Sequence, residues 1–217
     1  KARKVVFISE FARDQVLKEI DLPVDQFCVI PNPVSEDFVF QSKIFNNAKP
    51  VILHINGNLE RKNLARTIQA LDGIPCHLRI VGKLSSEISK VLANAKIEYS
   101  NVFDLSNEDV VNEYKNCDIV NFPSLFEGFG MPIVEGQAVG RPVVTSNISP
   151  MNEVAGTGAI RVDPTDVNAI KKAYLKVISD EDFRNNVIKK VLENVQQYRL
   201  RTVAGRYIKL DNEIAVK

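Results

Sequence analysis

The chain has no long hydrophobic run, few cysteines and almost no net charge, and each of these shortages excludes a class of protein. No apolar stretch approaches the roughly 18 residues that a membrane-spanning helix needs. The 28 basic and 27 acidic residues leave a formal charge of +1, so no overall field draws the chain to nucleic acid or to an anionic membrane. Any anion-binding site must therefore be local.

The three cysteines, Cys28, Cys76 and Cys117, are scattered through apolar stretches without metal-ligand spacing. An odd, dispersed set predicts free thiols in a reducing compartment rather than a disulfide framework. The chain also lacks a GxGxxG sequence after an early strand, which argues against a dinucleotide-dependent dehydrogenase. It begins without methionine and almost directly on a predicted strand, and we therefore expect it to be a fragment of a longer protein.

Short β-branched runs alternate with amphipathic stretches along most of the chain. Runs such as VILHI and LRIVG are apolar at nearly every position, as strands buried on both faces should be. This alternation predicts an α/β fold, a Rossmann-like parallel sheet with helices on both faces and a helical C-terminal tail. The predicted strands are 5–9, 27–31, 51–56, 77–82, 96–99, 118–123, 142–146 and 159–162. The predicted helices are 10–20, 63–71, 86–95, 107–115, 132–139 and 167–178, with two more near 181–197 and 200–214.

Changes in this pattern divide the chain into four parts. Residues 33–49 have no clear period and contain Pro33, Ser35 and two asparagines, which predicts a linker. Residues 1–32 form a lone β-α-β piece before it. Residues 50–197 form the main unit, and residues 198–217 are expected to form a final helix.

Glu127 and Glu135 flank a glycine-rich turn, FEGFGMPIVE, with seven residues between them. Pro132 fits the first position of the next helix, so the turn should lie at the carboxyl end of a parallel strand, where open α/β sheets bind ligands. Gly128 and Gly130 would let the backbone approach a ligand, and the helix N-terminus suits a phosphate. The carboxylates would then accept hydrogen bonds from the vicinal diols of a ribose or a hexose. Alternatively, Glu135 only favours the helix dipole and Glu127 is merely solvated.

The stretch GNLERKN, residues 57–63, follows another predicted strand and leads into a helix. Gly57 would permit a tight turn, and Arg61 and Lys62 would stand at the helix entrance. Paired cations beside exposed amides suit a diphosphate. The alternative, a solvated basic helix start, is unfavourable at the positive end of the helix dipole. Together the two loops describe a ligand with a diol at each end and a diphosphate between them, which is a nucleotide sugar.

These motifs in combination resemble the retaining GT-B glycosyltransferases of family 4. The E-x7-E spacing within PSLFEGFGMPIVEGQAVGRPVVTS is similar to that family's signature, and ISEFARDQVL, VIPNPV, GNLERKNL, IVGK, YKNCDIVNFPS, SPMNEVAG and VDPTD fall at the positions that the family's order predicts. The resemblance implies that residues 1–32 are the last β-α-β of a truncated acceptor-binding domain and that residues 50–197 are the donor-binding domain. It also implies that the helix in 198–217 packs back toward the first domain.

The resemblance further assigns roles to single residues. It implies that Glu127 contacts the hydroxyls of the donor sugar, that Glu135 takes the ribose diol, and that Arg61 and Lys62 bind the diphosphate. The other positions that it assigns to donor binding are Gly57, Asn58, Gly128, Phe129, Gly130, Met131 and Val134. Backbone near 82–83 or 102–103 is expected to meet the base.

The first loop departs from the family pattern. Asn58 follows Gly57 where many members have arginine, and no proline precedes Arg61. This departure leaves open which of Arg61 and Lys62 carries the charge of the leaving group.

The activity implied by the resemblance is transfer of a hexose from GDP-mannose or a UDP-hexose to a saccharide or lipid-linked acceptor. Transfer would retain the anomeric configuration and serve cell-envelope polysaccharide synthesis, and this chain would carry donor binding only. We expect no metal, no cofactor and no nucleic-acid partner, and a cytoplasmic location with peripheral association at the inner face of the membrane. A non-catalytic nucleotide-sugar-binding module and a glycoside hydrolase are the alternatives. His54 and His77 lie in apolar strands and are expected to be packed rather than to act as general bases.

Overall fold

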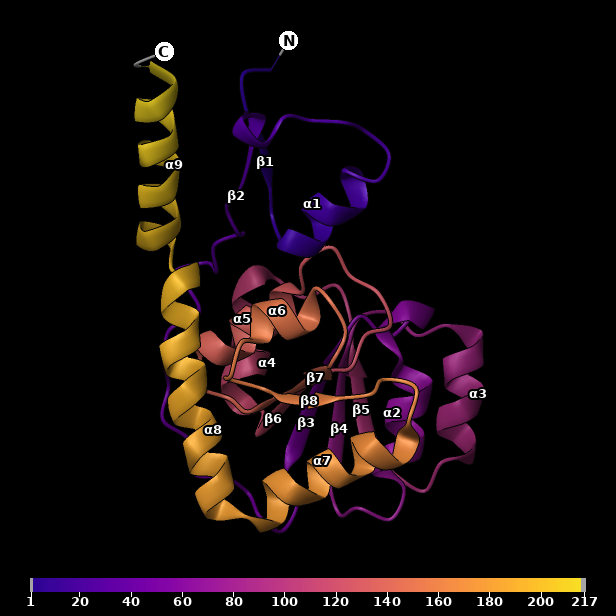
Figure 1. Cartoon of the computed structure of the whole chain (residues 1–217). Coiled ribbons are helices and arrows are strands. Elements are labelled where there is room, and N and C mark those ends of the chain that lie inside the picture. The colour runs from indigo at the N-terminus through magenta and orange to yellow at the C-terminus, as the bar shows by residue number, and fades with distance from the viewer. Residues whose placement is uncertain (1, 216–217) are drawn as a thin grey trace.

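A computed structural model describes residues 2–215, and a six-stranded parallel sheet forms its centre (Figure 1). The strands lie in the order β5-β4-β3-β6-β7-β8. Chain order runs outward in both directions from the pair β3 and β6, so the direction of the connections reverses between them. The predicted Rossmann-like α/β fold is confirmed. The strands are β3 Val51–Ile55, β4 His77–Val81, β5 Glu98–Val102, β6 Ile119–Phe122, β7 Val143–Ser146 and β8 Ile160–Val162.

Helices cover both faces of this sheet, because successive residues of a strand point to opposite sides. Leu53 and Val120 pack under α4, α5 and α6, whereas their chain neighbours Ile52 and Ile119 pack under α2, α3 and α7. In the described part of the chain, no helix combines the length and the apolar character needed to cross a bilayer. The helices are α2 Leu64–Leu71, α3 Ser86–Asn94, α4 Asn107–Asn116, α5 Met131–Ala138, α6 Met151–Ala155 and α7 Val167–Ser179.

The N-terminal residues form a second, two-stranded sheet. Strand β1 (Val5–Phe7) pairs in parallel with β2 (Phe27–Val29), and α1 (Glu10–Val16) and the 3-10 turn η1 (Val24–Gln26) lie between them in the chain. After α8 (Glu181–Asn194) and the turn η3 (Val195–Tyr198), helix α9 (Leu200–Ala215) runs beside this small sheet (Figure 1).

Apolar side chains join α9 to the small sheet. Val203 and Leu210 of α9 are buried together with Ile30, and Val6 and Cys28 pack against them. The last helix therefore returns to the N-terminal β-α-β piece. Residues 216 and 217 of the predicted tail lie outside the described residues.

Residues 33–49, predicted as a linker, are fixed to the main unit rather than free. Val34 is fully buried and forms an isolated bridge to the residue before α9. Phe38 packs edge-on against Tyr114 with ring centres 5.3 Å apart, and Lys43 forms an ion pair with Asp118. The sequence showed no period here because the segment makes scattered contacts and forms neither a helix nor an extended paired strand.

The bounds predicted for one strand and one helix were wrong, and one short helix was missed. Strand β5 occupies Glu98–Val102 rather than 96–99, because its five residues pair with all five of β4. Helix α1 ends at Val16, and residues 17–20 form only hydrogen-bonded turns. Helix α6 was not predicted, because its five residues, which follow Pro150, are too few to display a helical period.

The close packing of α5 on the sheet yields a stability prediction. A Cβ on Gly136 would lie 2.9 Å from Val120 Cγ2 and 3.1 Å from Val143 Cγ2, whereas a Cβ on Gly205 of α9 would meet nothing within 4 Å. We expect Gly136→Ala to lower the free energy of unfolding by about 1–3 kcal/mol, because β-branched valines have little room to move. Gly205→Ala should raise it by roughly 0.5–1 kcal/mol, because alanine favours a helix interior. Urea unfolding measures both, and a destabilised Gly205→Ala or an unaffected Gly136→Ala would contradict this packing.

Candidate functional site

The two loops singled out by the sequence lie against each other where the strand order reverses. Strand β3 leads into residues 56–63, and its neighbour β6 leads into residues 123–130. Leu125 N donates to Arg61 O at 2.7 Å, and Arg61 Nη1 donates to Phe126 O at 3.3 Å. These hydrogen bonds join both loops into one surface at the carboxyl end of the sheet.

Asn63 strengthens this junction from the end of the first loop. Its side-chain Nδ2 donates to Pro123 O at 2.9 Å and to Pro164 O at 2.6 Å. Asn63 is buried and has a φ of 63°, a left-handed conformation that asparagine tolerates better than most residues. One side chain therefore connects the loops that follow β3, β6 and β8, and sequence reasoning assigned it no role.

Glu127 is ion-paired to both predicted cations through a single oxygen. Its Oε1 lies 2.5 Å from Arg61 Nη1 and 2.7 Å from Lys62 Nζ. Glu127 and Lys62 are buried, whereas the Arg61 side chain is 42% exposed. Burial lowers the pKa of Lys62, and its hydrogen bond to Glu127 opposes that shift. The loops thus hold two cations around one carboxylate, with one cation facing the interior and the other facing solvent.

Glu135 lies on α5, at the end of the second motif, and is half-buried. Its Oε2 accepts a hydrogen bond of 2.5 Å from the hydroxyl of Tyr114, on α4. Burial raises the pKa of Glu135, while the Tyr114 hydrogen bond and the charge of Lys62 oppose the rise. A carboxylate that is partly removed from water in this way is typical of functional sites.

Gly57, in the first loop, is required for a different reason than the sequence predicted. The left-handed φ of 69° falls on Asn56, one residue before Gly57. Gly57 is required for space, because a Cβ there would lie 2.8 Å from Leu84 Cδ2 and 2.9 Å from Ile80 Cγ2. The next predicted residue, Asn58, is exposed at the start of the loop.

The two cations lie in a turn of their own directly before α2. Arg61 and Lys62 belong to the 3-10 turn η2 (Glu60–Lys62), and α2 begins only at Leu64. The reason is the left-handed conformation of Asn63, which ends the 3-10 turn before the helix starts. The cations therefore occupy the two positions directly before Asn63, the N-cap of α2, and stand at the helix entrance as predicted.

The second loop ends in a left-handed glycine that starts α5. Gly130 has a φ of 108° and is the N-cap, so α5 begins at Met131 and Pro132 occupies the second helical position rather than the predicted first. A Cβ on Gly130 would lie 3.1 Å from Ile133 Cδ1. A Cβ on Gly128 would meet nothing within 4 Å, so the space beside its Cα is open.

The other residues predicted to bind the donor sugar nucleotide differ in which of their atoms a ligand could reach. The side chain of Phe129 is buried and packs edge-on against Tyr198 at 5.8 Å, and Val134 is fully buried in the core. Only the backbone of these two residues is therefore able to meet a ligand. Met131 is half-buried at the start of α5.

A contact between the N-terminal piece and the second loop was also missed. Ser9 Oγ donates to Gly128 O at 3.0 Å. Glu153, on α6, accepts from Glu10 N at 2.8 Å and from Phe11 N at 3.3 Å, at the start of α1. Both segments belong to quoted motifs, ISEFARDQVL and SPMNEVAG, but spacing in a sequence cannot reveal that they meet.

The histidines are occupied by structural contacts. His54 is fully buried in β3, where Asn121 Nδ2 lies 2.7 Å from its Nδ1, and burial lowers the pKa of His54 to about 3. His77, at the start of β4, lies 3.1 Å from Glu98 Oε1 and 2.7 Å from Ser100 Oγ. Among residues 2–215, no group of three or more histidine, cysteine, aspartate or glutamate side chains is placed to hold a metal ion.

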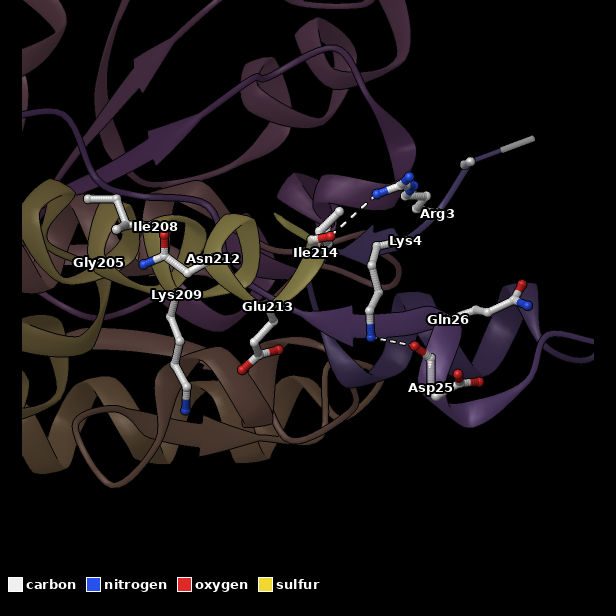
Figure 2. A pocket seen from close by; sticks show the side chains of 11 residues that line it. Arg3, Lys4, Asp25, Gln26, Gly205, Ile208, Lys209, Asn212, Glu213 and Ile214 are labelled. Atoms are coloured by element: carbon white, nitrogen blue, oxygen red, sulfur yellow. Dashed lines mark hydrogen bonds between the residues drawn. The ribbon is translucent and has the colours of Figure 1, made fainter. Parts of the chain in front are cut away.

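A groove of about 1070 Å³ lies apart from these loops, between α9 and the start of the chain. Figure 2 shows the Arg3 side chain donating to the backbone oxygen of Ile214 and Lys4 donating to that of Asp25. Lys209 and Glu213 of α9 also line it. The lining mixes both signs of charge without the paired cations of the β3–β6 edge, so we do not assign the candidate site here.

The chain belongs to the family of glycosyl transferases group 1, because residues 35–193 match that family's model. It is 25% identical over 221 residues to O-antigen chain mannosyltransferase B of Escherichia coli, covering 91% of this chain and 57% of the relative. It is also 25% identical over 208 residues to O-antigen chain mannosyltransferase RfbU of Salmonella typhimurium, covering 91% of this chain and 58% of the relative. The chain therefore spans little more than half the length of these relatives.

Solved structures share the fold over almost the whole chain. A sucrose-phosphate synthase from Thermosynechococcus elongatus superposes with a TM-score of 0.82 at 20% identity, covering 100% of this chain and 59% of that one. HepE of Anabaena, solved in complex with UDP and glucose, gives a TM-score of 0.82 at 15% identity, covering 97% of this chain and 63% of that one. The fold is thus that of GT-B glycosyltransferases, as the resemblance implied.

The burial of Glu135 predicts how stability depends on pH. Its pKa in the folded chain is raised above the unfolded value, so ionisation costs stability as the pH rises through the folded pKa. We expect Glu135→Gln to raise the midpoint of thermal unfolding at neutral pH and to lose this advantage as the pH falls below the pKa of Glu135. Glu113→Gln is the control, because Glu113 is ion-paired to Arg79 at 2.5 Å and its neutralisation should destabilise the fold. A Glu135→Gln chain that is less stable than wild type at neutral pH would contradict the assignment.

Proposed function

We propose that the chain binds a nucleoside diphosphate hexose, and that in the longer protein it is the donor-binding part of a retaining hexosyltransferase of family 4. The observation that supports this most is the pairing of Arg61 and Lys62 on one oxygen of Glu127, at the edge where the strand order reverses. Open α/β sheets bind ligands at such an edge. Two cations beside a carboxylate and an open glycine backbone suit a diphosphate next to a sugar.

In this proposal Arg61 and Lys62 bind the diphosphate, Glu127 accepts hydrogen bonds from the sugar hydroxyls, and Glu135 binds the ribose diol. Negative charge develops on the departing diphosphate as the glycosidic bond breaks. Cations that are already in place stabilise this charge more strongly in the transition state than in the ground state. The exposed guanidinium of Arg61 suits two phosphate oxygens at once, and Lys62 is a buried point charge.

The remaining assignments follow the geometry of the loops. The open backbone at Gly128, together with Gly130 and the backbone of Phe129, would line the sugar. Gly57 and Asn58 would lie beside the phosphates on the first loop, and the backbone of Met131 and Val134 would do so at the start of α5.

We propose mannose as the sugar to test first, because two similar relatives are named mannosyltransferases. The proposal includes GDP-mannose or a UDP-hexose as donor and a saccharide or lipid-linked acceptor held by the rest of the longer protein. Names that refer to the O-antigen chain support a role in cell-envelope polysaccharide synthesis. We also propose a cytoplasmic location, at the inner face of the membrane.

Two other functions remain to be tested against this one. A module that binds a nucleotide sugar without transferring the hexose would have the same donor contacts, so a transfer assay on the longer protein separates it. A glycoside hydrolase needs one carboxyl that donates a proton to the leaving group. Glu127 is instead the ion-pair partner of two cations, which favours the transferase.

Thermal unfolding with a panel of ligands tests the proposed function. We expect GDP and GDP-mannose, or else UDP and one UDP-hexose, to raise the unfolding midpoint, because a ligand that binds only the folded chain stabilises it. Arg61→Met should weaken binding of both members of the pair by about tenfold or more, since a charged hydrogen bond contributes roughly 1.5–3 kcal/mol.

Lys49→Met is the control for loss of one positive charge, because Lys49 is ion-paired to Glu98, on β5, and makes no contact with either loop. It should leave the affinity unchanged. If no nucleotide or nucleotide sugar shifted the midpoint and the chain cleaved a free glycoside instead, the hydrolase would replace the transferase.

A further inference from the structure

Tyr114 makes a contact that its place in the core does not require. It is fully buried on α4, and its ring packs edge-on against Phe38. A phenylalanine would fill the same volume without bringing a hydroxyl group into the interior. The hydroxyl donates instead to Glu135 Oε2 on α5, at 2.5 Å. Burial of a hydroxyl is unfavourable unless the group is hydrogen-bonded, so this side chain depends on Glu135 as its partner.

The hydrogen bond from Tyr114 restrains one carboxylate oxygen of Glu135 and leaves the other oxygen free to accept from a ligand. Within residues 2–215, the hydrogen bond from Tyr114 is the one that reaches this carboxylate, and it reaches Oε2. Oε1 is therefore the atom that a ligand hydroxyl can use. A carboxylate that binds a diol must keep one orientation, because its free oxygen has to face the diol.

We propose that Tyr114 is a positioning residue of the nucleotide site, whose hydroxyl orients Glu135 toward the ribose diol. This inference rests on the proposed function, since Glu135 binds ribose only if the chain binds a nucleotide. Tyr114 itself does not touch the ligand. It acts through Glu135 from a helix that contributes no other residue to the site.

A positioning role of Tyr114 should change the pKa of Glu135, and therefore the pH dependence of nucleotide affinity, whereas a role in packing alone should not. Two groups act on Glu135 against the effect of its burial: Tyr114 from α4 and Lys62 from η2. Both lower the pKa of Glu135. Removal of the Tyr114 hydroxyl leaves burial opposed by Lys62 alone, so the pKa of Glu135 should rise further. Because the diol donates to the ionised carboxylate, affinity is present above this pKa and is lost as the pH falls through it.

The test compares Tyr114→Phe with Tyr174→Phe. Tyr174 is a matched control, because it is also fully buried and its hydroxyl donates to a side chain, Asn121, in the core. Both variants lose one buried hydrogen bond, so both should be less stable than wild type. Calorimetric titration with UDP and with GDP from pH 5 to pH 8 then measures affinity separately from stability.

We expect Tyr114→Phe to bind the preferred nucleotide about three- to thirty-fold more weakly at neutral pH, as the loss of one charged or neutral hydrogen bond implies. Its loss of affinity on acidification should begin at a higher pH than in wild type. Tyr174→Phe should keep the affinity and the pH profile of wild type. If Tyr114→Phe also kept both, or if the two variants changed alike, Tyr114 would have a structural role only and the inference would be wrong.

A second measurement separates this inference from the proposed function. If the wild-type chain binds neither nucleotide, the nucleotide site itself is wrong. Carbon-13 NMR titration of the Glu135 carboxyl group still decides the contact between the two residues. A higher pKa of Glu135 in Tyr114→Phe supports the positioning role, and an equal pKa in the two chains overturns it.

Discussion

One carboxylate oxygen organises the edge of the sheet at which this chain is proposed to work. Glu127 Oε1 faces Arg61 and Lys62 at 2.5 and 2.7 Å, so the loop after β6 and the loop after β3 are joined by charge as well as by backbone hydrogen bonds. Lys62 is buried and loses solvation, and the adjacent carboxylate of Glu127 offsets part of that loss. The proposed diphosphate site thus has two cations placed around one carboxylate.

The order of the strands in the sheet brings the two loops together. Because β3 and β6 are neighbours although they are far apart in the chain, loops that are also distant in sequence emerge together. Helices cover both faces of the sheet, so its faces are closed to a ligand and its strand ends carry the proposed site. The close approach of α5 to the sheet at Gly136 fixes the helix that carries Glu135, and Asn63 ties the loops to the end of β8. Packing and hydrogen bonds therefore hold both loops and α5 at this edge of the sheet.

Sequence patterns predicted what depends on local repetition. The buried apolar runs and the alternation of strands with helices predicted the fold class. The two loops were recognisable because glycine, charged residues and proline cluster in them. Contacts between distant residues were not predictable. The hydrogen bond between Tyr114 and Glu135 joins two helices, and that between Ser9 and Gly128 joins two sheets. The reason that residue 57 is a glycine was also misjudged. A side chain there would collide with Leu84 and Ile80, which belong to other segments of the chain.

The central claim is that Arg61 and Lys62 bind the diphosphate beside the carboxylate of Glu127. Titration of bare UDP or GDP, whichever binds, into wild type and Glu127→Gln tests it most directly. The account predicts several-fold tighter binding to the variant, because a negative charge beside both cations and the phosphates has been removed. The unfolding midpoint checks that Lys62 tolerates the change. Equal or weaker binding by a folded Glu127→Gln chain would contradict the claim.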